Sequence, residues 1–355
     1  MTTILAFILM LGVLIFFHEL GHFLAARSVG VRVERFYIGF NLFGLGIKKK
    51  IGHTEYGLGL FPLGGYVKMA GMVDESMDTT ITGEPWEFQS KNTLQKIWIM
   101  SAGVIANLIL AVVVFTAVTF ADGVIENDPA PIVGALVPGY PAEGVGMQAD
   151  DNITAINGHN ITSWAELTAL IHSVPDEIIE VTWERSGETF HSAIKTRATE
   201  TWVRDEFKTV GLIGIEPKGV RRSVGIGEAV VSGFTTTRRW FVITYKSLGM
   251  IVTGKASLRD IGGPIMIAQL AGQSAQTGLA SFLRLLAIIS INLAFINILP
   301  IPALDGGQIA VVLIEAGLRR PLSVKVRMAI QQVGMMLLLT LMVVVIYNDI
   351  MRIFK

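Results

Sequence analysis

The chain has 355 residues, of which 51% are hydrophobic and only 16% are charged, and its formal net charge is zero. This balance gives no electrostatic footprint for nucleic acid, and the hydrophobic excess excludes an ordinary soluble protein. Because the chain contains no cysteine, disulfides and thiolate metal sites are excluded, and any metal must be bound by His, Asp or Glu.

Four segments are long and apolar enough to cross a bilayer, which takes about 20 residues. The first, Ile4–Ala26, is interrupted only by His18, Glu19 and His22. No Lys or Arg precedes Arg27, so we interpret this segment as a spanning helix and not as a signal peptide. The other three are 97–121, 285–304 and 329–348.

The basic residues predict how these helices are oriented. Lys and Arg concentrate in segments 27–96 and 306–328. The positive-inside rule places both segments in the cytoplasm. Both termini and residues 122–278 are therefore expected on the outside.

A glycine-rich, aromatic stretch follows the first span. Val33–Phe40 and Glu55–Met69 predict strands, with a turn near Gly52–His53. The stretch is unusually apolar for a cytoplasmic loop, which allows two interpretations. It forms a sheet against or partly inside the bilayer, where protein or a polar cavity satisfies its backbone, or an amphipathic hairpin on the membrane surface.

Residues 122–205 change to strands, turns and one helix. Strands are predicted at Ile132–Val137 and Asn152–Ile156, with tight turns at Asn157–Gly158 and Ser186–Gly187. Ser163 and Glu166 form a capping box that predicts a helix over 165–172.

This pattern resembles a PDZ domain of the bacterial protease-associated kind, and the resemblance rests on "PAEGVGMQADDNITAING", residues 141–158. Met147 replaces the usual Leu of that family, and Asp150 replaces the usual Gly. Such domains bind a peptide C-terminus or an extended segment at an exposed strand edge. Beyond it, aromatic and basic residues between 238 and 246 suit an amphipathic helix on the membrane surface.

His18 and His22 are four residues apart, so a helix presents both imidazoles on one face. That spacing lets both bind one zinc ion, and Glu19 beside them can take a proton from water. Ionisable groups inside a spanning segment are rare without a function. The alternative is a polar cluster that packs helices together.

A catalytic zinc site usually needs a third protein ligand. Asp305 is the candidate, because the first and third spans both run inward and their late residues share the cytoplasmic half of the bilayer. Its alternative role is a helix-end cap. Asn297 either donates to an oxyanion or packs between helices, and for Asn292 the same choice stays open. The four remaining histidines lie away from the spans, at positions 53, 159, 172 and 191.

Four motifs in order, with the PDZ-like insert, resemble the site-2 protease family, most closely the bacterial regulator-of-sigma-E proteases. The motifs are "HELGH" at 18–22, "PLGGYVKM" at 62–69, "SAGVIANLILAVV" at 101–113 and "NILPIPALDGG" at 297–307. The resemblance implies an intramembrane zinc metalloprotease with one zinc ion. Its ligands would be His18, His22 and Asp305, with Glu19 as general base and Asn297 as an oxyanion or substrate contact.

The resemblance also implies that the glycine-rich stretch is a membrane-re-entrant β-sheet whose edge binds the substrate as an added strand. Substrate contacts would come from Gly64, Gly65 and Tyr66, and from Asn292. The chain departs from the family at Asn41, where Gly is usual, and at Val104, where Pro is usual. It also shows one PDZ domain where many relatives carry two.

The fold class expected is a polytopic α-helical membrane protein with four transmembrane helices, a re-entrant β-sheet and one extracytoplasmic PDZ domain. The expected divisions are 1–28 for the first span, 29–96 for the re-entrant region, 97–121 for the second span, 122–205 for the PDZ domain, 206–278 for an interfacial segment, 279–305 for the third span, 306–328 for a cytoplasmic loop and 329–350 for the fourth span.

By resemblance, the protein would lie in the bacterial inner membrane, with its termini and PDZ domain outside and its active site toward the cytoplasm. Its substrate would be a single-pass membrane protein, such as an anti-sigma factor or a remnant signal peptide. The PDZ domain would act as a size filter or a peptide sensor.

Three other functions could place ionisable groups inside a membrane. A di-iron desaturase needs about eight histidines, more than the six present, and a transporter would show paired, inverted halves. A catalytically inactive membrane PDZ scaffold is the remaining alternative, although every proposed ligand and Glu19 are present.

Overall fold

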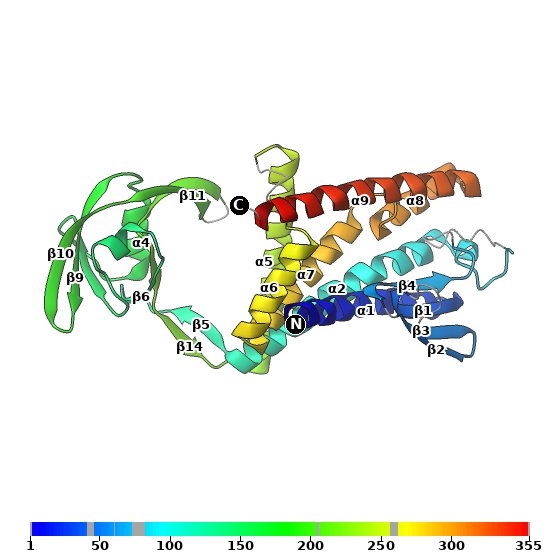
Figure 1. Ribbon diagram of the computed structural model, residues 1–355, viewed down its shortest axis with the longest axis horizontal. Helices are drawn as coiled ribbons and strands as arrows, with labels where there is room; N and C mark the ends of the chain where they lie inside the picture. The colour runs from blue at the N-terminus through cyan, green and yellow to red at the C-terminus, as the bar shows by residue number, and fades with distance from the viewer. Residues whose placement is uncertain are drawn as a thin grey trace. The chain divides into compact units, whose positions relative to one another are not determined.

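A computed structural model describes residues 2–40, 46–59, 61–72, 82–203, 206–255 and 262–353. The chain divides into two compact units (Figure 1). The helical unit combines Met1–Ala121 with Gly225–Lys355, and the strand-rich unit is Asp122–Val224. Asn41, where the chain departs from the family pattern, lies outside the described residues.

Four helices of the helical unit are long and apolar enough to cross a membrane. They are α1 (Thr2–Ser28), α2 (Thr93–Asp122), α7 (Leu279–Ile298) and α9 (Val324–Ile353). Only 11% of the apolar window of α9 is buried inside the protein, and no more than 39% of any other. The remaining apolar surface needs lipid to cover it, as in a membrane-spanning bundle.

The third span is shorter than expected, because α7 ends at Ile298 and not near residue 304. Pro300 and Pro302 follow at once, and proline both lacks a donor N–H and disfavours helical geometry in the residue before it. The chain turns through Ala303, whose φ is 74°. It then starts a new helix, α8 (Asp305–Leu318), inside the segment expected to be a loop.

The re-entrant region forms a four-stranded sheet in the order β2-β3-β1-β4. Its strands are β1 (Val33–Phe40), β2 (Gly46–Ile51), β3 (Thr54–Gly59) and β4 (Phe61–Met69). The strand region expected over 55–69 forms two strands on opposite sides of β1, with β3 parallel to it and β4 antiparallel. Among the described strands, β4 pairs only with β1 and forms one edge of the sheet, beside α1 (Figure 1).

A hydrophobic core joins the sheet to α1 and α2. Phe23 of α1 stacks edge-on against Phe36 of β1, with ring centroids 5.2 Å apart, and Ile99 of α2 is fully buried in the same cluster. Burial of these side chains fixes the sheet against the two helices. The ends of α1 and α2 that face the sheet therefore pack with it as one body.

Two further helices occupy the expected interfacial segment, α5 (Ile226–Val252) and α6 (Pro264–Thr277). Helix α5 exposes Phe234 and Tyr245 together with Arg238 and Arg239, a composition that suits a membrane surface. Asp349 of α9 is buried and accepts hydrogen bonds from three backbone N–H groups at the start of α6. This carboxylate satisfies N–H groups that a helix N-terminus otherwise leaves without partners.

The strand-rich unit contains a sheet in the order β10-β9-β7-β8, built from β10 (Glu188–Lys195), β9 (Ile178–Arg185), β7 (Asn152–Ile156) and β8 (His159–Asn160). Helix α4 (Trp164–His172) begins after Ser163, whose side chain accepts from the Glu166 N–H. This confirms the predicted cap. The turns predicted at 157–158 and 186–187 are also confirmed, with positive φ at all four residues.

The unit extends beyond the expected boundary at 205, because its later strands pair with its first ones. Strand β13 (Ile215–Pro217) pairs with β6 (Val133–Leu136), and β14 (Gly219–Arg222) pairs with β5 (Val124–Asn127). The remaining elements are α3 (Pro141–Gly144), β11 (Arg197–Val203) and β12 (Glu206–Leu212), the last two forming a hairpin ribbon. Short strands at the ends of a domain have little local signal, so pairing decides its limits.

Candidate metal centre

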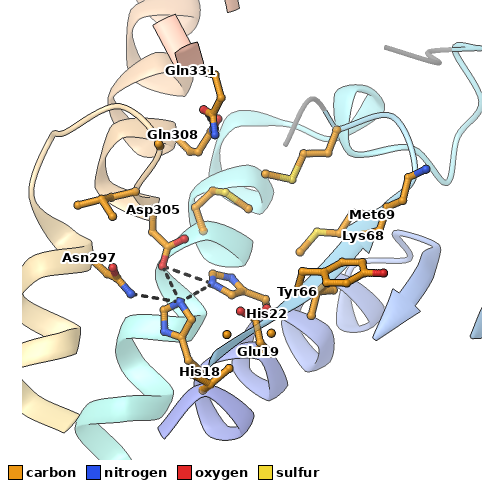
Figure 2. A pocket seen from close by; sticks show the side chains of 18 of the residues that line it. His18, Glu19, His22, Tyr66, Lys68, Met69, Asn297, Asp305, Gln308 and Gln331 are labelled. Atoms are coloured by element: carbon orange, nitrogen blue, oxygen red, sulfur yellow. Dashed lines mark hydrogen bonds and ion pairs between the residues drawn. The ribbon is translucent and has the colours of Figure 1, made fainter. Parts of the chain in front are cut away.

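The two histidines of α1 meet Asp305 of α8 at one point (Figure 2). His18 Nε2 and His22 Nε2 each lie 3.3 Å from Asp305 Oδ2, and the same distance separates the two nitrogens. The three residues form the one group of potential metal ligands found among the described residues. Helices far apart in sequence therefore bring these three donors together.

These three atoms fit a zinc ion. A tetrahedral ion with bonds of about 2.0–2.1 Å holds its ligand atoms about 3.3–3.4 Å apart, which matches each of the three observed separations. Asp305 Oδ2 is also buried without a hydrogen-bond donor. A buried carboxylate oxygen that faces two imidazole nitrogens fits a cation held between them.

Helix α2 packs against the two histidines and sets their positions. His22 Nδ1 lies 2.8 Å from the backbone carbonyl oxygen of Ile99. An N–H at Nδ1 that donates to this oxygen leaves the lone pair on Nε2, the atom that faces Asp305. Gly103 provides the space, because a β-carbon there would overlap His22 Nε2 and lie 2.6 Å from His18 Cε1.

A cavity of about 1000 Å³ opens beside the three ligands. Glu19 lines it next to the histidines, and Tyr66 lines it from β4 (Figure 2). Gly64 and Gly65 of the same strand also line the cavity. Gln308 of α8 and Gln331 of α9 lie at its border, joined by a hydrogen bond of 3.0 Å. The cavity is large enough for an extended peptide segment and water at the metal ligands.

Glu19 is held close to the edge strand. A β-carbon at Gly65 would lie 3.2 Å from Glu19 Cγ and 2.7 Å from Ile15 Cγ2. The absence of a side chain at residue 65 thus lets the strand approach the carboxylate closely. A peptide alongside β4 would pass within reach of Glu19.

Asn297 also lies where the sequence predicts. It sits in the last turn of α7, and its Nδ2 is 3.3 Å from His18 Nε2. Its amide is therefore next to the ligand triangle and lines the same cavity. An N–H donor at this position can face an oxygen bound in the cavity.

Asn292 lies elsewhere, which corrects the expectation of a substrate contact. Its Oδ1 accepts a hydrogen bond of 2.7 Å from Thr244 of α5, and it is not among the described residues that line the cavity. The five-residue spacing from Asn292 to Asn297 turns the two amides to different faces of the helix. Asn292 links α7 to α5.

Several residues at the site escape sequence reasoning. Gln308 belongs to segment 306–328, which was expected to be a loop. Gln331 belongs to the fourth span, for which the sequence offers only a hydropathy signal. Gly103 and Asn107 lie in the uncharged second span, where a buried amide is itself a signal of a polar partner. That signal was present in the sequence, but nothing in it indicated which partner.

The similarity of the chain to known proteins agrees with this site. The model of peptidase family M50 matches residues 6–341, and the chain belongs to this family, the site-2 proteases, and is a metalloprotease. A Clostridium perfringens protein named for zinc metalloprotease activity is 34% identical over 97% of both chains. The regulator of sigma-W protease RasP of Bacillus subtilis is 30% identical over 99% of both chains.

A solved PDZ domain, from an SdrC-like protein of Listeria monocytogenes, matches 26% of this chain and 93% of its own at 24% identity. Its TM-score of 0.22 is too low to carry an argument about fold. The family assignment therefore rests on the match over nearly the whole chain.

Proposed function

We propose that the protein uses one zinc ion, bound by His18, His22 and Asp305, to hydrolyse peptide bonds within or near the transmembrane segments of single-pass membrane proteins. The observation that carries the proposal is the triangle of donor atoms with 3.3 Å sides, next to a cavity lined by Glu19. A zinc ion there would supply Lewis-acid chemistry, polarising a carbonyl and acidifying water.

Glu19 is the group that moves the proton. Its carboxylate accepts a proton from the water that attacks the substrate carbonyl carbon, and then delivers it to the amide nitrogen as the C–N bond breaks. Water thus adds its oxygen to the carbonyl carbon, and both its hydrogen atoms end on the two products. Because the Asn297 amide lies beside His18, its N–H can donate to the carbonyl oxygen as negative charge develops there.

The substrate has to lose its helical hydrogen bonds before hydrolysis. In lipid, a backbone without hydrogen bonds is costly, so a spanning substrate stays helical unless other partners are offered. The free edge of β4 offers them, because Gly64, Gly65 and Tyr66 line the cavity from this strand. We infer that the substrate is bound there as an added strand.

For the strand-rich unit we propose a PDZ domain that binds a peptide C-terminus or an extended segment. Support comes from the α4 cap and the two tight turns, which follow the PDZ-like sequence pattern. Excision of residues 124–222 removes the paired strands β5 and β14 together. If the domain is a size filter, the excised protein cleaves longer, untrimmed substrates, whereas unchanged selectivity would argue against this role.

The orientation follows from the distribution of charge. Residues 27–96 carry nine Lys and Arg, and the segment before α9 is also basic, so we place both in the cytoplasm. The protein then spans the bacterial inner membrane, with its termini and the strand-rich unit on the outer side of that membrane. An anti-sigma factor or a remnant signal peptide fits the single-pass substrate class.

The test uses the full-length protein in detergent, with bound zinc and cleavage of a single-pass helical substrate measured together. Glu19→Gln keeps the zinc and abolishes cleavage, whereas Asp305→Ala loses both. Glu84→Gln is the control, because Glu84 is only half-buried and does not line the cavity. Full cleavage by Glu19→Gln would refute the mechanism, and a wild-type protein that binds zinc without cleaving any such substrate would favour the scaffold alternative.

A further inference from the structure

Asn107 of α2 is a buried amide that the proposed mechanism does not use. Its exposed fraction is 0%, and its Nδ2 lies 3.3 Å from Nδ1 of His18. Its Oδ1 is buried with no hydrogen-bond partner. A fully buried amide in the middle of an apolar span is costly unless its polar atoms are used.

The protonation of His18 decides which end of the amide faces it. If Nε2 of His18 binds a metal ion, the ring proton must lie on Nδ1. An Nδ1–H facing the NH₂ group of Asn107 would place donor against donor. The two ends of an amide have nearly the same shape, so its orientation is settled by hydrogen bonding. The orientation that suits a metal-binding His18 puts Oδ1 of Asn107 on Nδ1.

We propose that Asn107 is a positioning residue for the zinc site, and that its Oδ1 accepts the Nδ1–H of His18. This inference rests on the proposed function. Each histidine ligand then has an acceptor on α2 for its Nδ1–H, since the Ile99 carbonyl oxygen already lies 2.8 Å from Nδ1 of His22. Helix α2 then fixes the tautomer and ring orientation of both ligands, one through its backbone and the other through a side chain.

Asn107 is itself held in place by α7. The Ser290 hydroxyl, also buried, donates a hydrogen bond of 2.8 Å to the backbone carbonyl oxygen of Asn107. This bond fixes the backbone but does not involve the amide. Ser290 therefore offers a control that disturbs the same place without removing the acceptor.

The experiment measures the zinc affinity of the full-length protein in detergent by competition with a chelator. Asn107→Leu has a similar size but no acceptor, and we expect its zinc dissociation constant to rise about 10–100-fold. Asn107→Asp keeps an acceptor oxygen and is expected to restore affinity to within about threefold of wild type or better, as in carboxylate–histidine–zinc sites. Ser290→Ala is expected to bind zinc as wild type does.

A purely structural role of Asn107 predicts a different order of zinc affinities among these variants. The buried charge of Asn107→Asp should harm packing at least as much as Asn107→Leu does. Zinc binding by Asn107→Asp that is as weak as that of Asn107→Leu would therefore overturn the proposal. Wild-type affinity in Asn107→Leu would also overturn it. Asn107→Ala is a second acceptor-free variant with the same expectation, should the Leu variant fold poorly. If wild-type protein binds no zinc, the proposed function fails, whereas normal zinc binding by the acceptor-free variants refutes only the role of Asn107.

Discussion

Gly103 of α2 packs directly against His22 of α1, so closely that a β-carbon at residue 103 would overlap the Nε2 atom of the imidazole. It would also lie 2.6 Å from Cε1 of His18. Both proposed ligands from α1 thus depend on a missing side chain in the neighbouring helix. The site is formed by the contact between two helices as much as by the HExxH motif.

Gly103→Ala is therefore expected to weaken zinc binding at least about tenfold, because both imidazoles must move from the positions that match zinc. Bound zinc after chelator competition is the measurement. Gly12→Ala is the matched control in α1, since a β-carbon there meets nothing within 4 Å. Equal zinc affinity in the two variants would show that the imidazoles can shift without loss.

Gly65→Ala is expected to separate catalysis from metal binding. The new β-carbon would lie 3.2 Å from Glu19 Cγ and displace the carboxylate or the β4 edge, while the three ligands are untouched. A misplacement of about 1 Å can cost about 100-fold in rate. We expect cleavage to fall at least about tenfold with zinc affinity unchanged, measured side by side, and a loss of zinc would contradict this.

The strand-rich unit contains an ion pair whose carboxylate is fully buried. Asp151 has an exposed fraction of 0% and accepts from Arg185 through both oxygens, at 2.6 and 2.7 Å. Asp151→Ala leaves the guanidinium without its partner, so we expect hydrogen exchange in β9 to accelerate at least about tenfold. The neighbouring Asp150 forms an exposed pair with Lys218, and Asp150→Ala should change exchange little.

The loop before α2 is expected to loosen in acid. Glu87 is 3% exposed, and hydrogen bonds from Thr82, and from the backbone of Gly83, hold the pKa of its carboxyl below the usual value. A lowered pKa stabilises the folded loop above the ordinary carboxyl pKa of about 4.3, and that stability is lost as the pH falls through the folded pKa.

Hydrogen exchange at the Gly83 amide, corrected for its intrinsic rate, measures this effect. Protection should fall as the pH drops below about 5. Glu87→Gln removes the titrating group, so its protection should be lower at neutral pH and nearly independent of pH. A wild-type loop whose protection stays constant down to pH 3 would contradict the assignment.

The local elements were largely predictable, because their signals lie within a few residues of one another. The Ser163 cap and the Asn157–Gly158 turn were predicted from adjacent residues and are confirmed. The end of α7 at Ile298 was not, although Pro300 marked a distortion there. Hydropathy alone does not distinguish a spanning helix from a helix followed by a tight turn and a second helix.

The sequence by itself determined the membrane class, the His18–His22 pair on one helical face and the chemical type of the third ligand, because each depends on composition or on spacing along one element. Only the tertiary structure decided the rest. It placed Asp305 of α8 at 3.3 Å from both imidazoles and set Gly103 and Asn107 of α2 behind them. It also turned Asn292 toward Thr244. Contacts between helices depend on which faces pack, and packing is a property of the whole fold and not of any single segment.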